Sequence, residues 1–193
     1  NFMNTNMMES LFCASEKFKE STIVSYADII FEEKILRALI GSDEDFSIII
    51  DKNWKEYWEL RFENPIKDAE SLKIDNDGFI TNIGKKVNAV DEIEGQYIGL
   101  MKFQNNAIDK IKSFYDRCKL TYERNNTNPL NPNLAFKNSY MTDFLQGLID
   151  DNSKLKAVII EGGWLELDSM DDYNLYTKPN SEKLISKFFD KND

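Results

Sequence analysis

Two apolar runs in the sequence each lead into carboxylates that could bind a metal ion. The run at 23–31 contains Asp28, and the run at 156–160 leads into a loop that carries Glu166 and Asp168. Short apolar runs rich in β-branched residues predict strands buried in a mostly parallel sheet, and the ends of such strands face one crevice. Acids from two strand ends can meet there and hold one hard divalent cation. An aspartate after a strand is also a common turn residue or helix N-cap, so both interpretations stay open.

Composition excludes several other kinds of chemistry and partner. The 193 residues include no histidine, which excludes histidine-based triads, histidine general bases and histidine-ligated zinc. The net charge of -10 argues against binding to nucleic acid or to an anionic membrane surface. Cys13 and Cys118 form no CxxC pair, which suits a reducing compartment. Since no apolar run approaches the roughly 18 residues that span a bilayer, we expect a cytoplasmic protein with small-molecule partners, no nucleic acid and no membrane.

Helical and strand patterns alternate along the chain and predict a layered α/β domain. Helices are expected at 5–14, 32–40, 105–122 and 142–150, strands at 23–31, 46–51, 95–103 and 156–160, and a β-hairpin at 72–86. In the hairpin, an Asn-Asp-Gly turn joins two strands of alternating pattern. The amphipathic pattern from Ser181 predicts a helical tail within 178–193 that docks on the body or on a second subunit, so a homodimer is one expectation.

One further predicted helix, at 51–62, carries an aromatic face that ends in an arginine. Trp54, Tyr57, Trp58 and Arg61 fall on one side of this helix by their i, i+3, i+4 and i+7 spacing. The simpler interpretation is a helix whose apolar face lies in the core. The alternative is a pocket wall in which aromatic rings hold a cation and the arginine holds a phosphate. The pattern alone allows both.

Seven short motifs, spread over nearly the whole chain, carry a resemblance to a known family. They are Thr5-Asn6-x-x-x-Ser10-Leu11, Ser25 to Phe31, Trp54-x-x-Tyr57-Trp58-x-x-Arg61, Asp68-Ala69-Glu70, Gly95 to Leu100, Tyr140 to Asp143 and Gly162 to Asp168. With these motifs the chain resembles the sugar-phosphate nucleotidyltransferase superfamily. Within it, the likeness is to the CTP:phosphocholine cytidylyltransferase-like branch, which serves phosphonate, capsule and other cell-surface precursor pathways. The resemblance implies a Rossmann-like, three-layer α/β fold of the GT-A-like type, with a mixed, mostly parallel central sheet and a β-hairpin extension.

The same resemblance implies a Mg²⁺-dependent nucleotidyltransferase, with CTP as the expected nucleotide. Such enzymes transfer a nucleotidyl group to a phosphate or phosphonate monoester and release pyrophosphate. The attacking phosphate oxygen is already an anion, so no histidine is needed, and catalysis is mostly metal clamping and positioning. One alternative is a sugar-1-phosphate nucleotidyltransferase that makes NDP-sugars, against which the aromatic face argues. Another is a non-catalytic remnant that binds nucleotides or a partner subunit.

Carried over residue by residue, the resemblance makes Asp28 and Asp168 the ligands of the catalytic Mg²⁺. The residues expected to bind substrates are Trp54, Tyr57, Trp58, Arg61, Lys85, Glu94, Tyr97, Gly99 and Glu166. Of these, Lys85 is the expected phosphate contact, and Tyr97 and its neighbours lie along the acceptor side. The two tryptophans and the tyrosine of the aromatic face are a candidate pocket for an ammonium headgroup.

Two departures from the family pattern affect these expectations. The N-terminal signature of the family, a Gly-rich loop with an arginine followed downstream by a Lys-Pro, does not occur in this chain; in the family it cradles the triphosphate and recognises the base. We therefore expect residues 1–193 to form a single nucleotidyltransferase domain without its N-terminal nucleotide-binding segment, inactive by itself. The glycine that usually precedes the metal-binding aspartate is Ala27 here, a change that keeps the carboxylate.

Overall fold

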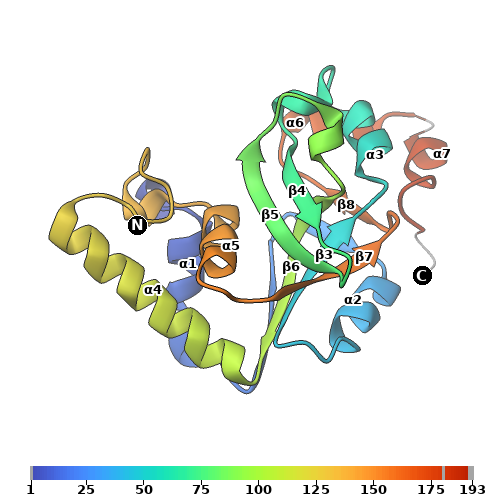
Figure 1. Ribbon diagram of the computed structural model, residues 1–193. Coiled ribbons are helices and arrows are strands. Elements are labelled where there is room, and N and C mark those ends of the chain that lie inside the picture. Colours follow the sequence, from blue (N-terminus) through green and yellow to red (C-terminus); the bar gives the residue numbers. More distant parts are fainter. Residues whose placement is uncertain (1, 180, 191–193) are drawn as a thin grey trace.

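A six-stranded mixed β-sheet organises the fold of this chain (Figure 1). The computed structural model describes residues 2–179 and 181–190. In spatial order, the strands of the sheet are β1 (Ser21–Ser25), β6 (Gln96–Gln104), β3 (Phe46–Asp51), β7 (Leu155–Ile160), β5 (Phe79–Lys86) and β4 (Glu70–Ile74). A separate two-stranded sheet pairs β2 (Ile29–Phe31) with β8 (Trp164–Glu166).

The pairing within the large sheet is mixed, as expected, but less parallel than expected. β3 and β7 run parallel, whereas the other four neighbouring pairs of the described sheet are antiparallel. The difference has two sources. β6 runs against both β1 and β3, and the predicted hairpin, formed by β4 and β5, joins β7 in antiparallel orientation. The α/β class, the mixed sheet and the hairpin are therefore confirmed, and the expected predominance of parallel pairs is corrected.

The run at 23–31 is not one buried strand, which corrects a second expectation. It divides at Tyr26 into β1, which lies at the edge of the described sheet, and β2, which belongs to the small sheet. Exposure alternates along β1, and Ile23 is 40% exposed, as a strand with one covered face requires. The Tyr26 N–H donates to the Gly99 carbonyl over 2.9 Å, after which the chain leaves the sheet. Asp28 therefore lies in the connection between the two sheets.

Helices cover both faces of the large sheet, which gives the expected three layers (Figure 1). On one side lie α1 (Met7–Cys13), α4 (Asn106–Asn125) and α5 (Met141–Asp150), and on the other α2 (Glu33–Ile40), α3 (Trp54–Arg61), α6 (Met170–Thr177) and α7 (Ser181–Ile185). Short 3-10 turns occur at Phe2–Asn4, Ser15–Lys17, Pro65–Lys67, Val90–Glu92 and Phe136–Asn138. Side chains alternate along a strand, so Ile48 and Ile50 of β3 enter one core and Ile49 enters the other.

The C-terminal tail packs against the body of the chain. Ile185 on α7 is buried in the core that also contains α2 and α3. Farther on, the Phe188 carbonyl accepts from the Gly163 N–H over 2.6 Å, and the Asp190 N–H donates to the Glu32 carboxylate over 2.7 Å. The structure thus supports the expected docking on the body. Residues 180 and 191–193 of the predicted tail lie outside the described residues, and the homodimer stays a prediction.

Candidate active site

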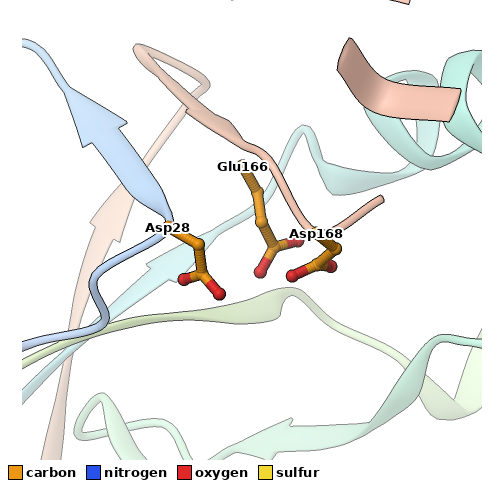
Figure 2. A group of neighbouring side chains, drawn as sticks. All are labelled: Asp28, Glu166 and Asp168. Atoms are coloured by element: carbon orange, nitrogen blue, oxygen red, sulfur yellow. The ribbon is translucent and has the colours of Figure 1, made fainter. Parts of the chain in front are cut away.

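Three carboxylates meet beside the small sheet of β2 and β8 (Figure 2). These strands run antiparallel with Ile29 opposite Glu166, and the Leu167 N–H donates to the Asp28 backbone carbonyl over 2.9 Å. The pairing places Asp28, just before β2, beside the residues that end β8. Glu166 and Asp168 point to the same side, as alternate residues of an extended segment do. Carboxylate oxygens of Asp28, Glu166 and Asp168 all lie within 4.8 Å of one another.

The donor set of this cluster fits a hard divalent cation such as Mg²⁺, which prefers carboxylate oxygens and keeps positions for substrate phosphates. Asp28 and Asp168, the two ligands predicted from the sequence, are brought together by the fold. Glu166, predicted as a substrate-binding residue, joins them. Its side chain is 17% exposed, whereas Asp28 and Asp168 are open to solvent. The signal for Glu166 was its spacing of two from Asp168 in an extended segment.

A buried arginine lies behind the carboxylate cluster. The side chain of Arg61 is 1% exposed, and its guanidinium nitrogens lie 2.5 Å from Glu166, 3.0 Å from Asp168 and 2.8 Å from Asp172. Burial raises the pKa of Glu166 to about 7; the charge of Arg61 opposes this rise, and the charges of Asp168 and Asp28 add to it. Because the guanidinium is buried against carboxylates of the protein, its predicted contact with a substrate phosphate is corrected.

The loop that leads into β8 is fixed by a buried aspartate. Gly162 and Gly163 have φ of 72° and 87°, which glycine adopts far more readily than other residues. The Asp51 carboxylate at the end of β3 accepts from the Gly162 N–H over 2.9 Å and from the Trp164 indole N–H over 2.8 Å. Burial raises the pKa of Asp51, and these two hydrogen bonds work against the rise. The Gly-Gly-Trp segment thereby determines where β8 and its acids begin.

Two adjoining pockets meet at the carboxylate cluster. The first, of about 260 Å³, is lined by Met7, Tyr26, Asp28, Trp58, Asp68, Glu70, Gln96, Tyr97, Tyr140, Met141, Thr142, Glu166 and Asp168. We call it the acidic pocket, because five of these residues are carboxylates. The second, the α1 pocket, of about 450 Å³, is lined by Thr5, Asn6, Met7, Ser10, Leu11, Val24, Ser25, Tyr26, Ala27, Asp28 and Met141. Since Asp28 lines both, the cluster lies where two ligands could meet.

The predicted substrate-binding residues of α3 and β6 divide between pocket and core. Trp58 and Tyr97 line the acidic pocket. Trp54 and Tyr57 line neither pocket; they are buried because this face of α3 packs into the core against other aromatic rings. Their predicted role as pocket walls is therefore corrected, and the simpler interpretation of the aromatic face holds for these two residues.

Three more predicted residues lie outside the pockets. Lys85 is exposed at the end of β5 and lines neither pocket. The Glu94 carboxylate accepts from the Ile74 N–H over 2.8 Å, so it supports β4 at the surface. Gly99 has φ 84°, and a Cβ there would come within 2.5 Å of the Tyr26 ring. Gly99 therefore acts by letting Tyr26 lie against the β6 backbone, and its direct contact with a substrate is corrected.

Two acids of the pocket, Asp68 and Glu70, are not among the predicted site residues. Asp68 accepts from the Trp58 indole N–H over 3.0 Å. Burial raises the pKa of Glu70, and a hydrogen bond with Thr142 opposes the rise. Both acids stand in one of the seven motifs, and their spacing of two at the start of a strand was the available signal for a shared face.

The chain is similar to known proteins in sequence and in fold. No protein-family model matches the chain. The CTP:phosphoglutamine cytidylyltransferase of Campylobacter jejuni subsp. jejuni serotype O:2 is 42% identical over 174 residues, covering 87% of this chain and 66% of that protein. The inositol-1-phosphate CTP transferase from T. maritima has a TM-score of 0.64 at 17% identity, covering 96% of this chain and 63% of that one. The CTP:phosphocholine cytidylyltransferase from Streptococcus pneumoniae has a TM-score of 0.61 at 16% identity, covering 94% and 65%.

The chain has the Rossmann-like fold of the two CTP transferases. The relative at 42% identity is a cytidylyltransferase by name. The sequence relative and the two fold neighbours are thus all cytidylyltransferases or CTP transferases by name, which confirms the resemblance of the chain to the cytidylyltransferase-like branch of the sugar-phosphate nucleotidyltransferase superfamily. The chain spans just under two thirds of the length of these three proteins, at 66%, 63% and 65%.

In the part of the chain that the structure describes, no helix is both long enough and apolar enough to cross a membrane. The predicted cytoplasmic location stays a prediction.

Proposed function

We propose that the protein is a Mg²⁺-dependent cytidylyltransferase that joins CTP to a small phosphate or phosphonate monoester and releases pyrophosphate. The observation that carries this proposal is the cluster of Asp28, Glu166 and Asp168 where two pockets adjoin. The shared fold of two CTP transferases supports the reaction class. The name of the relative at 42% identity supports CTP as the nucleotide.

The side chains of the cluster supply what such a transfer requires. Asp28, Glu166 and Asp168 would hold the cation, which when bound neutralises charge on the phosphates and polarises the transferred phosphoryl group. The attacking phosphate oxygen of the acceptor is already an anion, so no side chain has to remove a proton from it. This requirement fits a chain without histidine. The remaining contribution of the protein is to hold two substrates in line at the cluster.

The acidic pocket favours an acceptor with a positively charged primary or quaternary ammonium group. Asp68 and Glu70 add two carboxylates to the cluster, and Trp58 and Tyr97 supply aromatic rings. A cation is stabilised both by carboxylates and by aromatic faces. Phosphoglutamine, named for the relative, is an amino-acid derivative that offers such a group, as do phosphocholine and aminoethylphosphonate. A sugar-1-phosphate offers no cation to these acids, so this alternative is disfavoured.

The α1 pocket is the proposed position of CTP. It is the larger of the two, and Thr5, Asn6 and Ser10 give it polar side chains that can bind a base or ribose. Since Asp28 and Tyr26 line both pockets, a nucleotide in this pocket would place its phosphates next to the cluster. The acceptor would approach from the acidic pocket on the other side.

The test is a pyrophosphate-release assay with the product of the complete gene. The four NTPs would be crossed with phosphocholine, 2-aminoethylphosphonate, phosphorylated amides such as phosphoglutamine, and sugar-1-phosphates, each with Mg²⁺ and with EDTA. We expect release with CTP and one phosphorylated acceptor that carries an ammonium group, and none with EDTA. Release with sugar-1-phosphates alone would support the NDP-sugar alternative. No pyrophosphate release from the folded protein with any pair of substrates would favour a non-catalytic binding module.

Replacing Glu70 with glutamine should raise the KM for an acceptor with an ammonium group at least about tenfold, because a charge-assisted contact contributes roughly 1.5–3 kcal/mol. The KM for CTP should stay within about twofold, since Glu70 does not line the α1 pocket. Steady-state kinetics with each substrate varied in turn would measure both. Glu63→Gln, an exposed acid near α3, is the matched control. An equal rise in both KM values would contradict the assignment of Glu70 to the acceptor.

A further inference from the structure

Four side chains from α3 and α6 converge on Glu166 from behind the carboxylate cluster. Tyr57 and Arg61 lie one turn apart on α3, and Asp172 and Tyr176 lie one turn apart on α6. Each helix thus presents one hydroxyl and one charged group toward β8. We call these four side chains the clamp.

The two tyrosines of the clamp hold the backbone of Glu166. The Glu166 N–H donates to the Tyr57 hydroxyl over 2.8 Å, and the Tyr176 hydroxyl donates to the Glu166 carbonyl over 2.8 Å. The two hydroxyls lie 2.6 Å apart. Each hydroxyl has one proton, so the arrangement that satisfies all three contacts is a closed ring in which Tyr57 donates to Tyr176. Burial raises the pKa of both hydroxyls, which keeps them protonated at neutral pH.

Arg61 holds the side chains of the cluster. One nitrogen of the guanidinium lies 2.5 Å from Glu166, and another lies 3.0 Å from Asp168. Asp172 holds the remaining edge of the guanidinium, and its carboxylate accepts from the Nε–H of Arg61 over 2.8 Å. Burial works against the charge of Asp172, but hydrogen bonds from Arg61 and Ser169 dominate and lower its pKa. The arginine is therefore anchored on one side and presents a rigid fork of donors on the other.

We propose that the clamp is the positioning unit of the metal site, with Arg61 at its centre. This inference rests on the proposed function, because it takes Asp28, Glu166 and Asp168 as the ligands of Mg²⁺. Carboxylates that face one point repel one another. Arg61 counters this repulsion and keeps Glu166 and Asp168 together, so the cation meets a preassembled pair of ligands. The clamp lines neither pocket at the cluster and acts through these two acids.

The direction in which cation affinity changes distinguishes a positioning role of Arg61 from a simple effect of its positive charge. A positive charge beside a cation site by itself weakens binding, so losing that charge would tighten it. Loss of a positioning group acts in the opposite direction, and losing partners of metal ligands typically costs 10–100-fold in affinity. Arg61→Lys keeps the charge and removes the planar fork. It therefore isolates the positioning contribution.

The experiment is a titration with Mn²⁺ alone, followed by electron paramagnetic resonance, on the full-length protein without nucleotide or acceptor. We expect Arg61→Lys to weaken Mn²⁺ binding at least about tenfold. Tyr176→Phe, which keeps the ring and removes one hydroxyl of the closed ring, should weaken it about threefold. Two matched controls should leave it unchanged: Arg37→Lys, an exposed arginine paired with Glu33 on α2, and Tyr173→Phe, a tyrosine of α6 that is 50% exposed.

Circular dichroism and thermal unfolding would establish that each variant is folded. Unchanged or tighter Mn²⁺ binding in folded Arg61→Lys protein would overturn the proposal. If Arg61→Lys does not fold, Tyr176→Phe provides the test, because phenylalanine keeps the shape of the tyrosine ring. Unchanged Mn²⁺ binding in Tyr176→Phe would overturn the clamp, and weaker Mn²⁺ binding would support it. A wild-type protein that binds no Mn²⁺ would overturn the proposed metal site together with the clamp. Wild-type binding with unaffected variants would overturn the clamp alone.

Discussion

Replacing Asp28 with asparagine should abolish nucleotidyl transfer, lowering kcat at least about 1000-fold, because a bound metal contributes several kcal/mol of charge stabilisation to the transition state. Asparagine has the same shape but carries no charge, so the cluster loses one of its anionic ligands. The Asp28 side chain is exposed, and its backbone carbonyl would still accept from Leu167. The melting temperature should therefore stay within a few degrees. Pyrophosphate release at saturating substrates and a thermal melt measure the two quantities.

Asp171→Asn is the control for this substitution, since Asp171 is an exposed acid near the cluster, on α6, that is not part of it. Its activity should match the wild type. Asp168→Asn should behave like Asp28→Asn, because both supply oxygens to the same point. A folded Asp28→Asn protein with wild-type turnover would remove Asp28 from the metal site and with it the proposed reaction.

Trp164→Ala should lower the free energy of unfolding by about 4 kcal/mol, as truncation of a buried tryptophan does. Trp164 is 1% exposed, and its ring packs against Tyr57 and Trp58 at centroid distances of 5.3 and 6.1 Å. Removing it leaves a cavity and takes one donor from the buried Asp51 carboxylate. Since native domains are stable by roughly 5–15 kcal/mol, the loss is large. Urea unfolding followed by circular dichroism would measure it.

Trp164→Phe divides this effect into its two parts. Phenylalanine fills much of the volume but donates no hydrogen bond, so the expected loss is about 1–3 kcal/mol, the cost of an unsatisfied buried acceptor. Met170→Ala, at a position that is 68% exposed, should change stability by less than about 0.5 kcal/mol. A Trp164→Ala protein as stable as the Met170→Ala control would show that the ring is not a structural support of β8.

The proposed metal ligands could be predicted from the sequence because two kinds of information agreed. Asp28 and Asp168 each follow an apolar run, and each stands in a motif of the family. The fold brings them together, although by another route than expected. Asp28 reaches the cluster through the pairing of β2 with β8, not from the end of a central parallel strand. Apolar runs indicate that strands exist; they do not state which strands pair, since pairing depends on contacts far apart in the chain.

The role of the aromatic face of α3 could not be predicted from the spacing of its residues. A 3.6-residue period shows that Tyr57 and Arg61 point the same way, but it does not say what they point at. Their partners on α6, Tyr176 and Asp172, lie 119 and 111 residues farther along the chain. A buried arginine needs carboxylates nearby to offset the cost of leaving water. The spacing of residues within one helix cannot identify carboxylates that lie far away in the sequence. The prediction of a phosphate contact failed for that reason.

The acidic pocket also affects how substrates reach the cluster from solution. Five carboxylates line a space of about 260 Å³, and none of its described lining residues is a lysine or an arginine. The resulting field attracts cations and repels free nucleotide anions, over a range that dissolved ions screen within about 8 Å at physiological ionic strength. Added salt should therefore slow the encounter with a free metal cation and ease that with an unaccompanied nucleotide anion, so the proposed metal ion and nucleotide should respond to ionic strength in opposite directions.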